Sequence, residues 1–396
     1  MTQSQASTRL AAANGQLDEL RAHFPILANK GYFNACSYGP LSLEVEAALQ
    51  EYIRIRHEEG ARWDVYVDKA ENTRRLLADL LRCDADDVSV STSVSQSLNA
   101  LLSAFDFSGE RKRIVTTEFD FPTTAQILLA QESRGAQVCR VQVDDMGTAL
   151  RLEQFDDLID ERTALVQIPL VCYRNGVWTD IEPIVQLAHK RGALVIVDAY
   201  QAIGTRPYDV IASGADILVG GCTKYLLGGA GTGFMFTRKA STSGLLPVAT
   251  GWFAQSNPYA MDIHHHEPHS SARRFEAGTP NAVGLFAAEA GLQLLLDVGM
   301  QTVEDNIATV TDRLKEVVDR NGWQLVTPRD RHGAMLAIKS LDAPALVKRL
   351  AARDIILTER DNNIRVAPHF YNSAEDVAQL ESALQAESAL LPAVNA

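Results

Sequence analysis

The stretch GALVIVDAYQAIGTRPYDVIASGADILVGGCTK, residues 192–224, decides the fold. It holds two short apolar runs, ALVIV and ADILVGG, which read as buried strands. Asp198 ends the first run, and Lys224 follows the second run one βα unit later. Ligands of open parallel sheets bind beyond the carboxyl ends of the strands. Alone, Asp198 would be read as a capping residue and Lys224 as a solvated lysine. Together they indicate a ligand site.

Similar runs surround this stretch. RKRIVTTEFD at 111–120 and TALVQIPLV at 163–171 are further strand candidates. Between the latter and residue 192 lies TDIEPIVQLAHKRG, which begins with a Thr-Asp cap and ends in Lys-Arg-Gly, as helices do. Strands that alternate with helices predict βαβ units and a mostly parallel sheet. We therefore expect an α/β fold whose sheet is covered on both faces.

The pattern changes after residue 280. Long helices are expected over 282–299 and 300–322, followed by strands at 323–328 and 333–340. A helix over 343–354, a strand pair around 355–368 and a last helix from residue 373 complete a smaller α+β unit. We therefore expect three parts. They are an N-terminal segment (1–30) that packs on the small domain, a large domain (31–280) and a C-terminal domain (281–396).

Composition limits the class of protein. The 396 residues carry a net charge of -13 with no basic run, which argues against a nucleic-acid partner. No stretch approaches the ~20 apolar residues that cross a bilayer, so no membrane role is expected. The N-terminus lacks the apolar core of a secretory signal. Five scattered cysteines without a CxxC pair favour the cytoplasm over a disulfide framework or a zinc site.

Further chemistry is expected at the same sheet edge. The run 111–120 leads into an aromatic turn ending in Phe121, and VSVSTSVSQSLNALL at 88–102 places Ser and Thr at a helix start. Backbone N–H groups at a helix start suit a phosphate. A phosphate cradle, an aromatic face, a carboxylate and a lysine are what pyridoxal phosphate requires. Other glycine-loop motifs fail, because Lys224 precedes its glycines and Phe234 stands where GxGxxG needs a third glycine.

With these residues in place, the chain resembles a fold-type I pyridoxal phosphate enzyme of the class V aminotransferase superfamily, which includes cysteine desulfurases, epimerases and kynureninase. The resemblance covers nearly the whole chain and implies a mostly parallel sheet of the seven-stranded kind in the large domain. Its signatures are VDAYQAIG, GGCTKYLLGGAG, RRFEAGTPN and IRVAPHFYN. The segments most similar to kynureninase are FPTT at 121–124, YRNG at 173–176, GWF at 251–253 and the stretch from Tyr259 to Arg273.

The resemblance implies cofactor-binding roles at matching positions. Lys224 is the implied Schiff-base lysine and the catalytic base, Asp198 would pair with the pyridine nitrogen, and Gln201 would hydrogen-bond the ring oxygen. The other implied cofactor contacts are the stacking residue Phe121, the phosphate-binding Val94 and Ser95, the flanking Thr124 and Thr223, and Trp252 and Thr279, which would reach across the interface of a homodimer with shared active sites.

The substrate implied by the resemblance is an α-amino acid. Arg365 matches the arginine that clamps its α-carboxylate, a task that suits a bidentate guanidinium. Read without the resemblance, Arg365 would be a surface arginine after a turn. Asn34, Ser37 and His369 are further implied substrate contacts. A packed or capping histidine is the alternative for His369.

The reaction stays open between several members of the superfamily. Thr223 stands where kynureninases carry tyrosine, Thr124 replaces the aspartate of their FPTD, and the C-terminal RVAPHFYN is more similar to epimerases and lyases. No cysteine follows Cys222, which argues against persulfide transfer but leaves direct C–S cleavage open. We expect Cβ-bond cleavage, either kynureninase-like or by a C–S lyase. Aminotransfer and epimerisation are the alternatives, and a pyridoxal phosphate-binding protein without turnover is the remote one.

The run HHHEPH at 264–269 suggests a metal site at first sight. Adjacent histidines in an extended chain point to alternate sides, and no helical motif with an acidic residue accompanies them. We therefore expect no metal and interpret the run as a loop near the substrate mouth.

Overall fold

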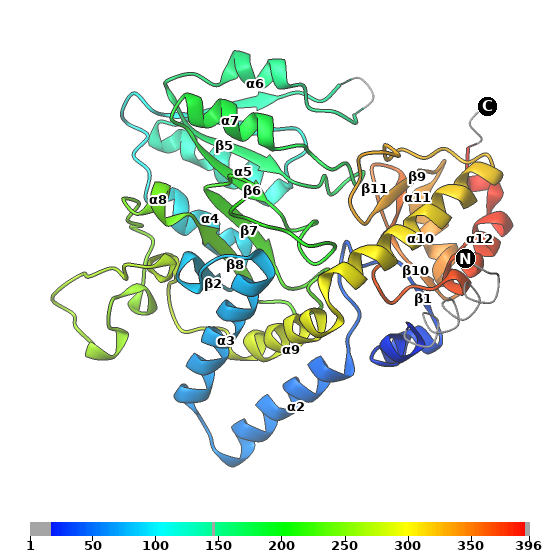
Figure 1. Cartoon of the computed structure of the whole chain (residues 1–396), viewed down its shortest axis with the longest axis horizontal. Helices are drawn as coiled ribbons and strands as arrows, with labels where there is room; N and C mark the ends of the chain where they lie inside the picture. The colour runs from blue at the N-terminus through cyan, green and yellow to red at the C-terminus, as the bar shows by residue number, and fades with distance from the viewer. Residues whose placement is uncertain (1–16, 145–146, 393–396) are drawn as a thin grey trace, which may run out of the picture.

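The computed structural model describes residues 17–144 and 147–392 of the chain. It confirms the predicted α/β class, with a large sheet between layers of helices and a smaller α+β unit beside it (Figure 1). Seven strands form the large sheet in the order β2-β8-β7-β6-β5-β3-β4. Their bounds are β2 Val88–Ser91, β3 Arg113–Thr117, β4 Gln137–Val141, β5 Thr163–Pro169, β6 Leu194–Asp198, β7 Ile217–Gly221 and β8 Gly233–Thr237.

Strand direction in this sheet brings many carboxyl ends to one edge. Neighbours from β3 to β7 pair in parallel, whereas β8 is antiparallel to both β7 and β2. β8 is therefore the one reversed strand, and the other six strands end at the same edge. Loops that leave this edge hold eight of the ten residues that the sequence predicts for cofactor binding, all except Trp252 and Thr279.

Alternating side chains along the strands serve two separate hydrophobic cores. Val166, Val195 and Val197 pack with Ile184 and Val185 of α7 (Glu182–Lys190) on one face of the sheet. Leu165 and Ile196 point to the other face and pack with the helix α4 (Val94–Leu102). The period of two in a strand sends neighbouring residues to opposite faces, so a sheet covered on both faces needs runs without polar interruption. The apolar runs in the sequence are explained by this double burial.

One sequence prediction about this sheet is wrong. Asp198 and Lys224 were expected one βα unit apart, yet residues 199–216 form turns and no helix. β6 and β7 nevertheless pair in parallel. Pro207 and two glycines with positive φ, Gly204 and Gly214, interrupt the crossover at short intervals, which a helix does not tolerate.

The smaller unit contains a three-stranded antiparallel sheet, β11-β12-β9, and a short parallel pair, β1-β10. The predicted strand at 323–328 is wrong, because Leu325 forms only an isolated bridge with Ile338. The strands are β1 Gly31–Tyr32, β9 Leu336–Lys339, β10 Ile355–Ile356, β11 Thr358–Arg360 and β12 Asn363–Val366, and the main helices are α10 Met300–Arg320, α11 Ala343–Ala351 and α12 Ala374–Ala386.

The described part of the N-terminal segment contacts this smaller unit. Arg21 pairs with Asp376 (2.6 Å), and Phe24 packs against the rings of Phe370 and Tyr371. β1 then continues the contact by pairing with β10. The division into parts at residues 30 and 280 stays a prediction, because the sheets and contacts do not mark chain boundaries.

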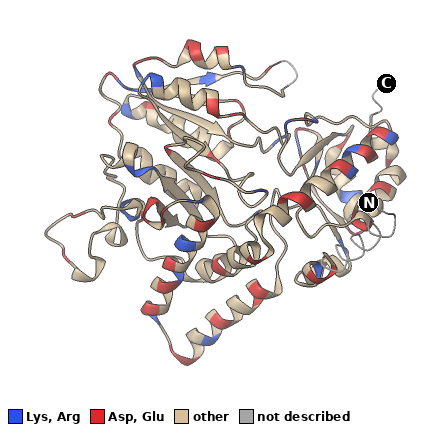
Figure 2. Cartoon of the chain, in the orientation of Figure 1, with Lys and Arg blue, Asp and Glu red and all other residues tan. Residues whose placement is uncertain are grey.

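The helices α2 (Leu43–Glu58), α3 (Trp63–Leu81) and α9 (Ala282–Val298) pack together below the large sheet (Figure 1). Acidic and basic residues alternate along the outer helices, without a continuous basic face in this view (Figure 2). In the described ranges no single helix is long and apolar enough to cross a membrane. The bent pair α9–α10 passes that test by length and composition alone.

Candidate active site

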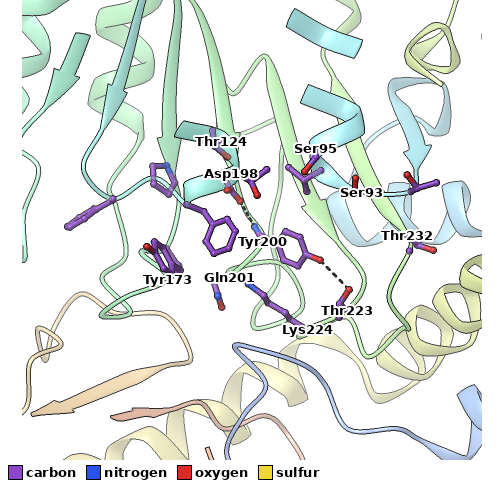
Figure 3. Close-up of a pocket in the computed structure, with 18 residues that line it drawn as sticks. Ser93, Ser95, Thr124, Tyr173, Asp198, Tyr200, Gln201, Thr223, Lys224 and Thr232 are labelled. Carbon is purple, nitrogen blue, oxygen red and sulfur yellow. Dashed lines mark hydrogen bonds between the residues drawn. The ribbon is translucent and has the colours of Figure 1, made fainter. Parts of the chain in front are cut away.

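A cavity of about 260 Å³ lies at the shared carboxyl edge of the large sheet. Side chains from the loops after β2, β3, β5, β6 and β7 surround it (Figure 3). Eight of the predicted cofactor-binding residues line this cavity: Val94, Ser95, Phe121, Thr124, Asp198, Gln201, Thr223 and Lys224. The other lining residues are Thr92, Ser93, Phe119, Thr123, Pro169, Val171, Tyr173, Tyr200, Gly231 and Thr232.

The amine of Lys224 lies between two aromatic rings. Its Nζ is 4.5 Å from the ring centre of Tyr200 and 5.8 Å from that of Phe121. Burial lowers the pKa of Lys224 to about 8, although the nearby Asp198 carboxylate opposes this shift. A substantial fraction of the amine is therefore neutral at moderately alkaline pH. A neutral amine can attack a carbonyl carbon or accept a proton.

Asp198 lies at the buried end of β6. One of its oxygens accepts a hydrogen bond from the backbone N–H of Tyr200 (3.0 Å). Burial raises the pKa of Asp198, while that hydrogen bond, the charge of Lys224 and the hydroxyl of Thr124 act in the opposite direction. A buried carboxylate at this point favours a cationic partner in the cavity. A protonated ring nitrogen is such a partner.

The start of α4 forms one end of the cavity. Ser93 caps this helix by accepting a hydrogen bond from the N–H of Gln96 (3.2 Å). The first-turn N–H groups of a helix have no partner within it, and those of Val94 and Ser95 belong to residues that line the cavity. Gly233 of β8 lets the sheet approach this turn closely, since a Cβ there would lie 2.6 Å from the carbonyl carbon of Ser93. The arrangement suits an anion such as phosphate.

Phe121 forms an aromatic wall together with Tyr173. Their rings meet edge to face, with centres 4.9 Å apart. The buried Asp120 fixes the turn before Phe121 by accepting hydrogen bonds from the hydroxyls of Thr116 and Thr117. Phe121 is therefore held in place in the turn that connects β3 to α5 (Pro122–Ala130).

The predicted substrate-binding residues occupy different places. Arg365 is buried on β12, and its Nη1 donates to the carbonyl oxygen of Tyr173 (2.7 Å), while its Nε has no hydrogen-bond partner in the described residues. Arg365 does not itself line the cavity, but Tyr173, whose carbonyl it binds, does, and the Arg365 charge acts together with burial to lower the pKa of Lys224. The buried Oδ1 of Asn34 also lacks a partner among the described atoms, whereas Ser37 is exposed.

The structure does not place His369 at the cavity. Its Nε2 donates to the carbonyl oxygen of Tyr225 (2.9 Å), and its Nδ1 accepts from the N–H of Phe370 (2.8 Å). Burial lowers the pKa of His369 to about 4, so the neutral ring is kept. The predicted substrate contact is wrong for this geometry. The histidine instead supports the backbone next to Lys224.

Trp252 and Thr279 do not line the cavity of their own chain either. Thr279 borders a small cavity next to the main one, and the two cavities share Thr92 and Gly231. Trp252 lies at the base of an exposed loop that also carries His264, His265 and His266. The loop projects away from the sheet (Figure 1, left), so in this single chain HHHEPH does not border its own cavity, and its expected position near a substrate mouth stays a prediction. No cluster of three metal-binding side chains occurs in residues 17–144 and 147–392.

Tyr200 is the functional candidate that sequence reasoning missed. Its ring lies between Asp198 and Thr223, and its hydroxyl is 3.2 Å from the Oγ1 of Thr223 (Figure 3). Gly221 makes room for this phenol, because a Cβ there would lie 2.4 Å from the Tyr200 oxygen. Its sequence signal was a tyrosine two residues after the strand-end aspartate, opposite a glycine on the next strand.

The cavity residues suit pyridoxal phosphate on structural grounds. Oε1 of Gln201 and Oγ1 of Thr232 are buried without a hydrogen-bond partner in the described part of the chain, although both residues line the cavity. Buried polar atoms rarely stay unpaired in native proteins. An amine, a carboxylate, an aromatic wall and a helix start complete the set. Fold and site together define a class of protein: enzymes of fold type I that use pyridoxal phosphate.

Comparison with known proteins gives the family. The family model for class V aminotransferases matches residues 45–380, so the chain belongs to that family. A relative in Bacillus subtilis (strain 168), the uncharacterised aminotransferase YcbU, is 32% identical over 91% of this chain and 95% of its own length. The kynureninase of Geobacillus thermodenitrificans (strain NG80-2) is 27% identical over 91% of this chain and 89% of its own.

A solved structure has a similar fold. C-DES, in a lysine-to-alanine variant with glycine covalently linked to its PLP cofactor, superposes with a TM-score of 0.84 at 19% identity. The match covers 92% of this chain and 98% of that one. The predicted family, fold class and cofactor are confirmed, and the cofactor of this chain is pyridoxal 5′-phosphate. The roles of its individual residues stay proposals.

The low pKa of Lys224 predicts an unusual pH dependence of labelling. In cofactor-free protein, acetylation of Lys224 should rise with pH and level off above pH 8, because burial lowers its pKa to about 8. Mass spectrometry of the labelled peptides would measure it, with the exposed Lys239 as the control in the same sample. Asp198→Asn should move the midpoint to lower pH. A midpoint above pH 10 would contradict the burial.

The close contact between Gly221 and Tyr200 predicts a steric effect. Gly221→Ala should push the phenol into the cavity and weaken pyridoxal phosphate binding about tenfold, since overpacking costs ~1–3 kcal/mol. Fluorescence titration of the cofactor would measure the dissociation constant. Tyr200→Ala in the Gly221→Ala background should restore binding. Equal affinities for the wild type and Gly221→Ala would show that the contact is unimportant.

Proposed function

We propose that the chain acts on an α-amino acid and most readily cleaves a bond at Cβ, as a kynureninase-like hydrolase or a C–S lyase. The observation that carries this proposal is the joint presence of Lys224, Asp198 and the α4 start in one cavity, with Arg365 bonded to the backbone of the lining residue Tyr173. When bound, the cofactor supplies an electron sink for the electron pair released at Cα. The protein then has to position the substrate and move protons.

Each residue has a distinct task in this proposal. Arg365 holds the substrate carboxylate through the donors that its bond to Tyr173 leaves free. Lys224, neutral above pH ~8, accepts the Cα proton. Asp198 keeps the ring nitrogen protonated, and the N–H groups of Val94 and Ser95 hold the phosphate. Gln201 offers a free oxygen to the ring substituents.

Two phenols favour cleavage at Cβ over aminotransfer. Tyr173 and Tyr200 both line the cavity, and burial raises the pKa of each, so both stay protonated. A proton donor besides the base at Cα assists the loss of a group from Cβ, whereas the proton shift of aminotransfer gains nothing from a second donor. The kynureninase relative supports the same choice.

Aminotransfer or epimerisation is the second candidate. The relative with 32% identity is described as an uncharacterised aminotransferase, which favours transfer of the amino group. Both candidates use the same cavity and the same Lys224. They differ in where the proton goes after it leaves Cα.

A homodimer with shared active sites belongs to this proposal. Large apolar side chains are exposed on the loop that also carries Trp252, among them Met261 (66% exposed) and Ile263 (88%). Exposed apolar groups gathered on one segment favour a partner surface. A second copy of the chain would cover them and bring Trp252 and Thr279 to the neighbouring cavity. Because the five cysteines are unpaired, a reducing cytoplasmic location stays our expectation.

Substrate screening tests the proposed reaction. Purified yellow protein should change its absorbance with kynurenine or with cysteine conjugates and release anthranilate or a thiol, which product analysis identifies. Lys224→Ala should lose turnover at least ~10³-fold, since it removes the base, yet still bind amino acids. A keto acid that keeps the whole side chain of the substrate would select aminotransfer, because elimination of a thiol from Cβ yields the thiol with pyruvate and ammonia instead. A colourless protein that takes up no cofactor would refute the whole proposal.

Subunit mixing tests the shared site. Lys224→Ala and Thr279→Val should each be weakly active, and co-refolding the two should restore activity, because a mixed dimer then holds one intact site. Lys224→Ala mixed with Asp198→Ala is the matched control, since both defects lie in the same cavity. Restoration in neither mixture, or a monomer in light scattering, would refute the shared site.

A further inference from the structure

A β-hairpin of the small unit contacts the loop after β5, which carries the cavity residue Tyr173. β11 and β12 are joined by Asp361 and Asn362, which both have positive φ (52° and 57°), as a tight two-residue turn requires. Asp361 pairs with Arg174 (3.7 Å), and Arg365 donates to Tyr173 (2.7 Å). The hairpin is therefore anchored on the loop after β5, which carries the cavity residue Tyr173.

Strand register puts a second arginine on the same face as Arg365. Arg360 pairs with Asn363, and Thr358 pairs with Arg365. Because side chains alternate along a strand, Arg360 and Arg365 lie on the face directed at the large domain. Ile364 points the other way into the core of the small unit. Arg360 stays exposed, and in the described ranges it takes part in no ion pair.

Arg360 shares a hairpin face with Arg365, and its charge acts on two cavity residues. It adds to the burial and the Arg365 charge that lower the pKa of Lys224, and it opposes the burial that raises the pKa of Tyr173. Among the cavity-lining residues of the described chain, Asp198 alone is acidic. The carboxylate at the turn of the hairpin, Asp361, is already paired with Arg174. The hairpin face that carries Arg365 therefore holds one guanidinium more than the α-carboxylate requires.

We propose that the substrate is an α-amino acid with a second anionic group on its side chain, and that Arg360 binds that group. This inference rests on the proposed function, in which Arg365 binds the α-carboxylate. Arg360 then serves as a specificity-determining residue on the same hairpin face as Arg365. A carboxylate or another planar oxyanion matches the fork of a guanidinium.

Matched pairs of amino acids isolate the effect of the side-chain charge. Aspartate and asparagine have nearly the same shape, as do glutamate and glutamine. Apparent dissociation constants come from the absorbance change of the cofactor-loaded protein on titration, which needs no turnover. We expect the acid to bind about tenfold more tightly than its amide, as for a charge-assisted hydrogen bond.

Variants assign this preference to Arg360. Arg360→Gln should bring the acid-to-amide ratio close to one by weakening only the acids, and Arg360→Lys should keep part of it. Arg313→Gln, an equal charge change at an exposed site on α10, should leave the ratio unchanged. Circular dichroism confirms that the variants fold.

The outcomes separate the two proposals. Equal affinities for acid and amide in the wild type, or a preference that survives Arg360→Gln, overturn the role of Arg360. Equal weakening of acids and amides by Arg360→Gln overturns it as well, because Arg360 would then bind the α-carboxylate. If none of the four amino acids changes the absorbance and the screen with kynurenine and cysteine conjugates is also negative, the proposed function fails and the substrate class fails with it.

Discussion

Withdrawal of the Lys224 amine from water is the constraint on which the rest of the site depends. An ammonium group loses hydration in such a place, and its pKa falls, unless charge or aromatic faces compensate. Here Asp198 and the rings of Phe121 and Tyr200 supply part of the compensation. The balance leaves an amine that gains and loses its proton near neutrality. A fully solvated lysine at the same position would stay charged and could not act as a base.

The backbone that carries Lys224 is fixed from three directions. Gly39 donates its N–H to the carbonyl of Thr223 (2.9 Å), and His369 donates to that of Tyr225. From below, Gly291 of α9 allows direct backbone contact, since a Cβ there would lie 2.6 Å from the carbonyl carbon of Leu227. Gly228, in the glycine-rich run after Lys224, likewise allows close packing, since a Cβ there would lie 3.0 Å from the Cα of Ala288. Rigid support of this kind keeps a catalytic group at one distance from its target.

The sequence predicted the features that depend on strand ends and failed where tertiary contacts decide. Asp198 and Lys224 were found because apolar β-branched runs mark buried strands and end at a common edge. Tyr200 was missed because its place in the cavity depends on Gly221 in the neighbouring strand. Local sequence does not show which strands are neighbours. His369 was misassigned because the motif indicates where the residue lies along the chain but not which way its side chain points. The expected helix between β6 and β7 failed because glycine and proline spacing overrides the βα pattern.

The pairing of β1 with β10 joins the beginning of the described chain to residues more than three hundred positions later. The same early segment also supplies Gly39, which contacts the loop of Lys224. Contacts between such distant parts of a sequence form late in folding. During synthesis, the large sheet can therefore assemble while its active-site loop still lacks support on one side. The nascent protein would become competent only after its last third has emerged from the ribosome, which delays the capture of a reactive aldehyde until the fold is complete.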